Sequence, residues 1–371
     1  MRLDGRGLPV VAVSTLTAAG LSSRGLGQRV LEGNHPPPRE VPAPSPSRPE
    51  DIRQKKLMSR AAWFSALVMR GALVEAKWSE QRAEIGAFFG VGASGAEMDE
   101  VARLVAASLE GERFSLARCG EEGLDACNPL FAFQIMNNFT LCHGAILEGL
   151  AGPNAAFFSR GTGTVTALEE ACAAILAGDC ERVLVGGADT ALHPVTLAEL
   201  EREGFSRQGL VPAEGAAALA IAAASDAPLA FVEAVRVFPV DRPRGALVPR
   251  TGVLRDAAVP AALDALDDLS CDVVVLAPWG APAREALQDL PEMLEVPLSV
   301  DATRFLGEAL AATPALAWVL ALDLLAAADK ERALVLSAGP DGDLGAVVLG
   351  RGAWGRSSTR PSAAPIGEGG A

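Results

Sequence analysis

Apolar residues recur along this chain at two different periods, which predicts an alternation of helices and strands. Residues 57–78 carry apolar side chains at helical spacing, and residues 85–91 form an apolar run that enters a glycine turn, as a buried strand does. The apolar patch at residues 9–13 soon turns polar and is too short for the core of a signal peptide. We therefore expect residues 1–20 to provide a buried first strand.

The most informative pattern is an internal repeat of one helix followed by two strands. In each copy, a polar turn ending in Glu-Arg leads from the helix into the first strand. The expected helix and strands are residues 165–176, 182–185 and 216–223 in the first copy, and residues 316–328, 333–336 and 346–349 in the second. Continuous apolar strands between apolar helices indicate sheets that are covered on both faces. The repeat thus predicts a duplicated, layered α/β fold whose two copies pack face to face.

Two segments interrupt this pattern. Residues 34–51 are rich in proline and serine, a composition that does not sustain a helix or a central strand, so we expect a loop. Residues 352–371 are mostly Gly, Ser, Pro, Ala and Arg and are expected to form a disordered tail. The predicted organisation is an N-terminal half over residues 1–225, a C-terminal half over residues 226–351, and the tail.

Charge and cysteine content narrow the class of protein. The 32 basic and 46 acidic residues give a net charge of −14, which disfavours nucleic acid and anionic membranes as partners. No apolar run is expected to approach the ~18 residues of a membrane span. The six cysteines show no CxxC pair and no metal-ligand spacing with the three histidines, so we expect reduced thiols, no metal and a cytoplasmic protein.

One long block resembles a known family. Residues 152–189, GPNAAFFSRGTGTVTALEEACAAILAGDCERVLVGGAD, resemble the segment around the nucleophile of β-ketoacyl synthases, the ketosynthase branch of the thiolase superfamily. The GPN, GGAD and AEGA sequences at residues 152–154, 186–189 and 213–216 follow the order and spacing of that family. The resemblance extends over nearly the whole chain. It implies an α/β, thiolase-like fold with a duplicated five-layered αβαβα arrangement.

The resemblance also implies that the nucleophile is missing. In the family, a cysteine lies on a tight turn at the start of a buried helix, whose N–H groups favour a thiolate and a developing oxyanion. That position holds Gly161, which has no side chain to carry an acyl group. No cysteine lies between Cys142 and Cys172, and Cys172 falls on the apolar stripe of the helix, as a core residue does. Ser159 or Thr162 would replace the nucleophile only with an activating base, and the sequence shows no obvious partner for either.

The other family positions with a chemical role are replaced as well. Trp279, in VVVLAPWGAP, stands where the resemblance places the first catalytic histidine; in the stretch TRFLGE, Arg304 takes the lysine position and Glu308 the position of the second histidine. Pro340 stands at the gating aromatic of a GFGG-type turn. Tryptophan accepts no proton, and a carboxylate repels a malonyl group or an enolate. We expect Arg304 and Glu308 to form an i,i+4 ion pair that fills the emptied pocket.

The three histidines of the chain offer no substitute base. His35 lies in the proline-rich segment, and His193 precedes Pro194 in an expected turn. His143, in FTLCHGAI, is expected to be a core residue. No catalytic residue and no cofactor are therefore assigned.

A ketosynthase-like chain without these groups resembles the chain-length factor of type II polyketide systems. Such factors commonly carry glutamine at the position of Gly161, and the chain is nearer to the shorter ketosynthase-like subunits of aryl-polyene pathways. The resemblance implies a non-catalytic subunit that forms a heterodimer with an active ketosynthase, in polyketide or fatty-acid-type elongation. It would shape the tunnel of the acyl chain and leave the acyl carrier protein to its partner. Two alternatives stay open: a divergent acyl-thioester enzyme (decarboxylase or hydrolase) and a stand-alone acyl-binding scaffold.

The resemblance places two further sets of residues. Phe157 and Phe158 belong to the strand that crosses the dimer axis in the family, and two adjacent large apolar residues fit either an interface or a buried core strand. Residues 128–139 correspond to the segment that approaches the partner's tunnel. Within it, three apolar side chains either limit the acyl chain or pack in the core: Phe131, Phe133 and Met136. Gly161 is expected to add free volume to the pocket.

Overall fold

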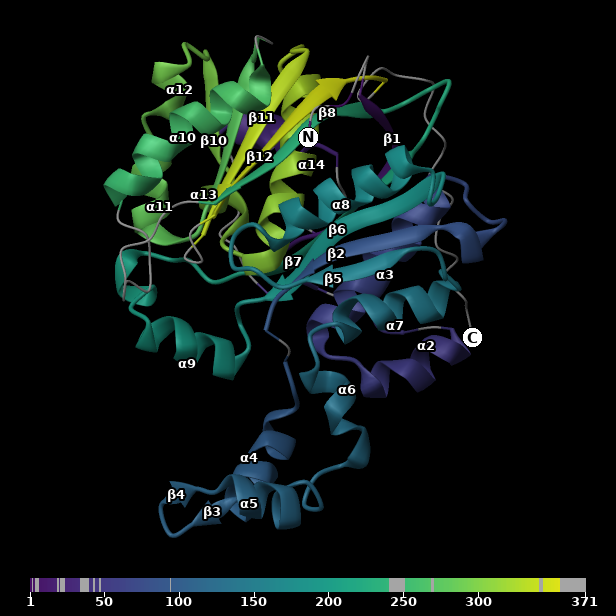
Figure 1. Cartoon of the computed structure of the whole chain (residues 1–371), viewed down its shortest axis with the longest axis vertical. Coiled ribbons are helices and arrows are strands. Elements are labelled where there is room, and N and C mark those ends of the chain that lie inside the picture. Colours follow the sequence, from purple (N-terminus) through teal and green to yellow (C-terminus); the bar gives the residue numbers. More distant parts are fainter. Residues whose placement is uncertain are drawn as a thin grey trace, which may run out of the picture.

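The fold is described from a computed structural model (Figure 1). It describes residues 1–353 except 2, 4–6, 19, 21–23, 34–39, 43, 47, 94, 240–250, 268–269 and 340–342. The expected tail from residue 354 onward and the gate position Pro340 lie outside the described residues.

In this part of the chain, ten strands form one sheet that consists of two equivalent halves. The N-terminal half contains β1 (Leu8–Leu16), β2 (Gly86–Val91), β5 (Asn154–Phe157), β6 (Arg182–Thr190) and β7 (Glu214–Ala222), in the spatial order β1-β7-β6-β2-β5. The C-terminal half contains β8 (Ala230–Pro239), β9 (Val273–Pro278), β10 (Leu298–Asp301), β11 (Arg332–Ala338) and β12 (Asp343–Arg351), in the order β8-β12-β11-β9-β10.

Both halves use the same order and the same strand directions. In each, the second strand pairs in parallel with the third and the fourth, and the fifth strand pairs antiparallel with the fourth and the first. The first strands, β1 and β8, join the halves through a short antiparallel contact, Leu8–Val10 against Ala230–Val232. The duplication inferred from the repeat is confirmed.

Helices separate and cover the two halves of the sheet. Alternate residues of one strand face opposite layers: Val185 packs in the central core, whereas Leu184 packs in the core beneath α3. The central core contains α8 (Gly163–Ala177) and α14 (Thr313–Ala327) together with strands of both halves. The outer helices are α3 (Arg60–Glu75) and α7 (Phe139–Glu148) on the N-terminal half, and α10 (Thr251–Leu266) and α11 (Gly280–Leu287) on the C-terminal half. The layers therefore run α/β/α/β/α, as expected for the thiolase-like fold.

The central position of α14 corrects one expectation. Among the described residues, the helical stretch Leu310–Ala327 is long and apolar enough to cross a membrane, so the statement that no run approaches such a length is wrong. The bent pair Pro129–Ile135 and Phe139–Glu148 passes the same test if it counts as one span. Since 89% of the 310–327 stretch is buried inside the protein, its apolar character is that of a helix between two sheet layers.

The expected loop at residues 34–51 is also corrected at its end. Helix α2 (Pro49–Gln54) begins inside it, with Pro49 in the first turn, where proline is favourable because its missing N–H has no helical acceptor. Asp51 of this helix is buried and accepts two hydrogen bonds from Arg70 of α3, 2.8 and 2.9 Å long. Arg70 also bonds Glu148, the last residue of α7. The network attaches α2 to the outer helical layer.

One segment projects from the body. The projecting segment (residues 98–135) hangs below the rest of the molecule in Figure 1. It contains α4 (Met98–Ala107), β3 (Leu109–Glu110), β4 (Arg113–Phe114), α5 (Leu116–Arg118), the π-helical turn Cys119–Gly123, the 3-10 turn Pro129–Phe131 and α6 (Ala132–Ile135). Helix α4 contains no buried residue.

The remaining elements are short. The α-helices are α1 (Leu26–Leu31), α9 (Pro194–Arg202), α12 (Leu290–Met293) and α13 (Thr303–Leu306), and the 3-10 turns are Lys55–Leu57, Arg82–Glu84, Ser206–Gln208 and Leu310–Ala312.

Candidate functional site

At the N-terminal end of the central helix α8, the backbones of the two halves of the protein are in close contact. Gly161 has a φ of +103°, and a Cβ built on it would lie 2.6 Å from the backbone N of Gly339 at the end of β11. The reverse is equally close, because a Cβ on Gly339 would lie 2.6 Å from the Cα of Gly161. Such distances do not occur for real side chains. The expectation that Gly161 adds free volume is wrong, because the backbone of Gly339 occupies that space.

The structure brings Gly161, Trp279 and Glu308 to one small cavity. It measures only about 10 Å³, roughly the space that a single water molecule needs. Leu310 and Thr313 complete one side of it. The described lining contains no thiol and no imidazole, so it offers neither a nucleophilic sulfur nor a histidine base.

Trp279 fills the position between β9 and α11 with an aromatic ring. The side chain is buried and packs edge-on against Phe205, with ring centroids 6.2 Å apart. It belongs to a small apolar cluster with Leu200, Leu210 and Leu310. Its indole N–H has no hydrogen-bond partner among the described residues. The ring therefore acts through its bulk.

Glu308 is held by donors of a neighbouring helix. Its carboxylate is 2% exposed and accepts hydrogen bonds from the Gly280 N–H (2.8 Å) and from Nη2 of Arg284 (3.0 Å), both in α11. Burial raises the pKa of Glu308 to about 7, although these two donors oppose the shift. Arg284 also bonds Asp301 at the end of β10 (2.8 Å). Both oxygens of Glu308 are therefore engaged in fixing α11 to the core.

The expected Arg304–Glu308 ion pair is wrong. Arg304 is 67% exposed and pairs with Asp301 (3.4 Å), whereas Glu308 pairs with Arg284. The reason is local: α13 ends at Leu306, and Gly307 follows with φ +69° and ψ −178°. Helical i,i+4 spacing therefore does not extend to Glu308.

A second cavity of about 70 Å³ lies on the other side of Trp279 and Leu310, which line both cavities. Its walls come from the turn before α8, where Phe158, Ser159 and Arg160 lie, and from α9. Arg160 pairs with Glu203 (2.6 Å), another residue of the lining. The volume accommodates only a few atoms.

Two hydroxyl groups at the head of α8 have a partner that the sequence did not reveal. Ser159 Oγ and Thr162 Oγ1 lie 3.3 Å apart, and Thr162 Oγ1 donates to Asp343 Oδ2 over 3.5 Å. Asp343 is 181 residues away in the sequence, next to the glycine turn that carries the gate position. The bond to Thr162 is at the limit of hydrogen-bond length. The Asp343 carboxylate is thus connected to Ser159 through the hydroxyl group of Thr162.

Asp189 is a buried carboxylate of the GGAD sequence, and the sequence alone assigned no role to it. It lies at the end of β6, fully buried, and accepts hydrogen bonds from the backbone N–H groups of Thr190 (2.8 Å) and Ala311 (3.1 Å). Burial raises its pKa to about 7, opposed only by these two donors. Asp189 fixes the 3-10 turn Leu310–Ala312, in which Leu310 has a positive φ of 49°.

Phe157 and Phe158 lie at an edge of the sheet. In the described sheet β5 is the last strand and pairs with β2 alone. Phe157 packs partly against the central core, whereas Phe158 is 56% exposed. Of the two alternatives, interface or buried core strand, the core alternative fits Phe157 but does not fit Phe158.

The three expected tunnel residues differ in exposure, and none lines the two cavities. Phe131 is buried. Phe133 packs edge-on against Phe139, with ring centroids 4.8 Å apart, and lies near His143. Met136 is 50% exposed. Of the three, Met136 is the side chain that is free to reach another molecule.

The remaining candidate groups are structural. Cys172 and His143 are buried, as expected; burial raises the pKa of the Cys172 thiol to about 12 and lowers that of His143. His193 ends the turn at residues 191–193, as expected, and is the N-cap residue of α9. His35 lies outside the described residues. Within the described chain, no three His, Cys, Asp or Glu residues gather closely enough for a metal ion.

Gly161→Ala is expected to destabilise the protein strongly, because the new methyl group meets the backbone of Gly339 and the φ is unfavourable. Gly178 at the other end of α8 is a matched control, since its φ is also positive (+78°) but a Cβ there meets nothing within 4 Å. Urea unfolding should show a loss of roughly 1–2 kcal/mol for Gly178→Ala and of about 2–5 kcal/mol for Gly161→Ala. Equal losses would contradict the close contact.

Asp189 should make stability depend on pH. Its raised pKa means that the folded protein binds the proton more tightly than the unfolded chain. The resulting stabilisation is fully present below about pH 4 and is lost as the pH rises to about 7, by at most about 4 kcal/mol. In urea unfolding between pH 4 and 8, the advantage of the wild type over Asp189→Asn should shrink as the pH rises. Asp179→Asn, in the exposed turn after α8, serves as control; parallel profiles for all three proteins would contradict the assignment.

Comparisons with known proteins agree with this architecture. The family model of the β-ketoacyl synthase N-terminal domain matches residues 49–227. No curated protein sequence matches the chain. Among solved structures, the chain is similar to a type II polyketide synthase acyl carrier protein in complex with its ketosynthase bound to the hexaketide (AntDE:AntF). The alignment covers 95% of this chain and 100% of that chain, with 14% sequence identity and a TM-score of 0.72.

Two further structures align over similar lengths. The ishigamide ketosynthase/chain length factor is 19% identical, with 93% of this chain and 99% of its own covered and a TM-score of 0.65. A β-ketoacyl synthase from Burkholderia phymatum STM815 is 15% identical, with 94% and 100% covered and a TM-score of 0.71. At these identities the structures establish the fold. Residues 49–227 thus match the N-terminal domain of the β-ketoacyl synthase family, and the described chain has the ketosynthase fold over both halves.

Proposed function

We propose that this chain is a non-catalytic ketosynthase-like subunit that pairs with an active β-ketoacyl synthase and shapes the tunnel of the growing acyl chain. The observation that carries the proposal is the filled centre of the site. Gly161, Trp279 and Glu308 meet at a cavity of about 10 Å³, and the Gly339 backbone closes the head of α8. A thioester substrate has no room there and no sulfur to receive its acyl group.

The edge of the N-terminal half supports the pairing. Among the described residues, β5 pairs on one side only, and an uncovered edge strand is a template for pairing with another chain. Phe158 follows this strand and is exposed. These features suit an interface along β5.

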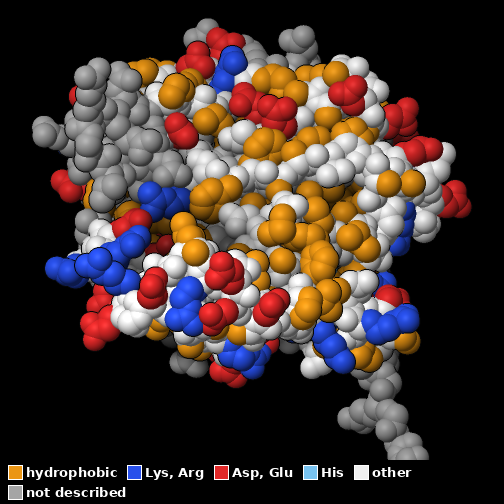
Figure 2. Space-filling view, turned by 60° about the horizontal axis from the view of Figure 1, so that its bottom comes forward, with side chains coloured by type: hydrophobic (Ala, Val, Ile, Leu, Met, Phe, Trp, Pro, Cys, Tyr) orange, Lys and Arg blue, Asp and Glu red, His pale blue; other side chains and the backbone are white. Residues whose placement is uncertain are grey.

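The projecting segment supports the pairing as well. Figure 2 shows a broad hydrophobic area on the face that comes forward when the bottom of Figure 1 is turned toward the viewer. Eight large apolar residues of this segment and its end are exposed: Met98, Val105, Phe114, Leu116, Leu124, Leu130, Ile135 and Met136. Exposed apolar surface of this kind marks a protein contact.

The proposal extends to the other partners by analogy with the aligned structures. One of them is a ketosynthase/chain length factor, and another is an acyl carrier protein in complex with its ketosynthase. For this chain we propose that the active partner receives the carrier protein in polyketide or fatty-acid-type elongation, in the cytoplasm. The acyl chain itself would reach this subunit only along the shared tunnel.

A divergent acyl-thioester enzyme is the second candidate, and one observation favours it. Ser159 lines the 70 Å³ cavity and lies 3.3 Å from Thr162, which bonds Asp343. The carboxylate does not reach Ser159 itself, so proton removal lacks a direct base. Turnover of a malonyl or acyl thioester by the isolated chain, lost in Ser159→Ala, would favour this candidate over the pairing subunit.

Co-expression with an active β-ketoacyl synthase from the same genome should give a stable heterodimer. Phe158→Glu should prevent co-purification, because it places a charge on the edge that we assign to the interface. Leu263→Glu is the matched control, since Leu263 is 55% exposed but lies on α10, over the C-terminal half. Size-exclusion chromatography and native mass spectrometry check the outcome. A homodimer that ignores the ketosynthase would instead favour the stand-alone acyl-binding scaffold.

Met136→Ala and Phe133→Ala in that heterodimer should lengthen the acyl products, because both changes remove side-chain bulk near the proposed tunnel. Met136 should have the larger effect, since Phe133 is partly held by Phe139. Mass spectrometry of the released chains measures the effect, with Leu263→Ala as control. Products of unchanged length would contradict the tunnel assignment.

A further inference from the structure

The outer end of the projecting segment presents apolar side chains to solvent. The tip, as we name residues 109–125, contains β3, β4, α5 and the π-helical turn Cys119–Gly123, and lies at the bottom of Figure 1. Three of its large apolar side chains are exposed: Phe114 to 49%, Leu124 to 61% and Leu116 to 82%. Since the burial of apolar surface is favourable, these side chains suit contact with another molecule.

The charged side chains of the tip are mostly carboxylates. Residues 109–125 include five acidic and two basic residues, which give the tip a net charge of −3. One of the two cations, Arg118, is paired with Glu122 (2.5 Å). Its pKa is raised mainly by this hydrogen bond, and the charges of Glu110 and Glu121 add to the shift, so the carboxylates gather around one guanidinium group. Four of them are exposed and lie outside this ion pair: Glu110, Glu112, Glu121 and Asp125.

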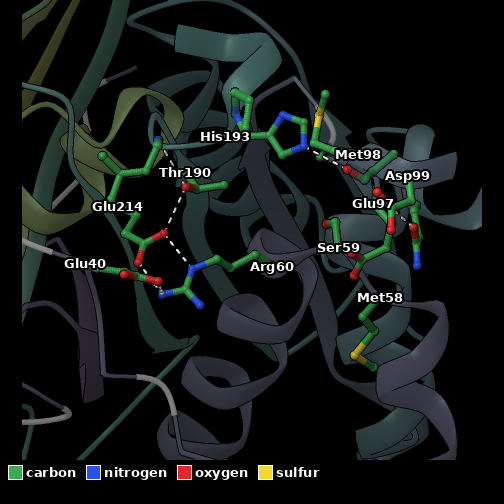
Figure 3. A pocket seen from close by; sticks show the side chains of 15 residues that line it. Glu40, Met58, Ser59, Arg60, Glu97, Met98, Asp99, Thr190, His193 and Glu214 are labelled. Atoms are coloured by element: carbon green, nitrogen blue, oxygen red, sulfur yellow. Dashed lines mark hydrogen bonds and ion pairs between the residues drawn. The ribbon is translucent and has the colours of Figure 1, made fainter. Parts of the chain in front are cut away.

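The base of the projecting segment is acidic as well. A cavity of about 460 Å³ lies there between the segment and the body, and Figure 3 shows Glu97 and Asp99 on one side of it. Arg60, on the other side, donates two hydrogen bonds to Glu214 and pairs with Glu40 (3.1 Å). Among the described residues of the lining, carboxylates therefore outnumber cations, and the acidic character extends from the tip to the base.

Apolar side chains surrounded by carboxylates restrict which molecule can cover the tip. A second copy of this chain would bring either another tip of the same charge or the body of a chain whose net charge is −14. Like charges brought together at an interface oppose association, whereas complementary charges favour it and exclude wrong partners. A surface that is apolar at its centre and basic at its rim gains the apolar contact and the charge pairing together.

We propose that the exposed carboxylates of the tip determine the partner of this chain. They keep two copies apart and select an active ketosynthase that covers the tip with an apolar surface rimmed by basic residues. The inference rests on the proposed pairing and adds to it the residues that choose the partner. The exposed apolar side chains then stabilise the pair, and the carboxylates make its formation dependent on salt.

The first test follows self-association of the isolated full chain at low salt by analytical ultracentrifugation. The tip variant, Glu110→Gln/Glu112→Gln/Glu121→Gln/Asp125→Asn, should self-associate roughly tenfold more tightly than the wild type, because its apolar side chains meet without repulsion. Adding Leu116→Ser and Leu124→Ser to this variant should remove the gain. The control neutralises four exposed carboxylates outside the projecting segment, Glu80→Gln/Asp179→Asn/Glu181→Gln/Asp226→Asn, and should behave as the wild type. Equal self-association of the tip variant and the control would overturn the proposal.

The second test measures the affinity of the heterodimer with an active β-ketoacyl synthase from the same genome. The tip variant should weaken the pair roughly tenfold at low salt, and the difference from the wild type should shrink at about 500 mM NaCl, where the charges are screened. The control variant should leave the affinity unchanged. A pair that forms equally well with both variants would overturn this proposal and leave the pairing intact, whereas absence of any heterodimer would overturn the pairing and, with it, the selection of this partner.

Discussion

A close backbone contact joins the two halves of this protein, and much of the site follows from it. Gly161 at the head of α8 and Gly339 at the end of β11 lie so near each other that neither can carry a Cβ. Close contact of this kind needs glycine on both sides, since a side chain on either residue would push the halves apart. The same contact leaves no room for a side chain at position 161. Packing between the two halves therefore fixes the residue type at the head of α8.

The rest of the site is filled in two physically different ways. Trp279 supplies apolar bulk, and its packing against Phe205 separates the two small cavities. Glu308 is a charged group in a buried place, which is costly unless donors surround it. Arg284 and the Gly280 N–H provide these donors, both from α11. Trp279 and Glu308 thus hold the neighbouring segments together, and both side chains are buried.

The sequence predicted the architecture well because the architecture is repeated. Two copies of an apolar helix followed by apolar strands indicated two similar layers, and the strand orders of the halves are the same. The motif spacing also singled out Gly161, Trp279 and Glu308, and the structure places all three at one cavity. The errors concern partners distant in the sequence. Arg284 replaces Arg304 as the partner of Glu308, because Gly307 ends the helix that the spacing assumed.

Other features were missed for the same reason. Asp51 looked like a loop residue because prolines precede it, and only the fold shows that Arg70 lies beside it. Asp343 reaches Thr162 across 181 residues, and nothing in the local sequence marks either as a partner. The cavity of about 460 Å³ between the body and the projecting segment is lined by six separate parts of the chain. Short-range patterns report helices and strands, whereas ion pairs and cavities depend on how those elements are arranged.

The projecting segment extends away from the body of the molecule (Figure 1). Its helix α4 contains ten residues and no buried side chain, and an isolated helix of that length is marginal in water. The stability of such a segment has to come from contacts outside itself, and its exposed apolar side chains gain free energy only when another surface covers them. The exposed apolar side chains of this segment are therefore the surface that the proposed pairing would cover.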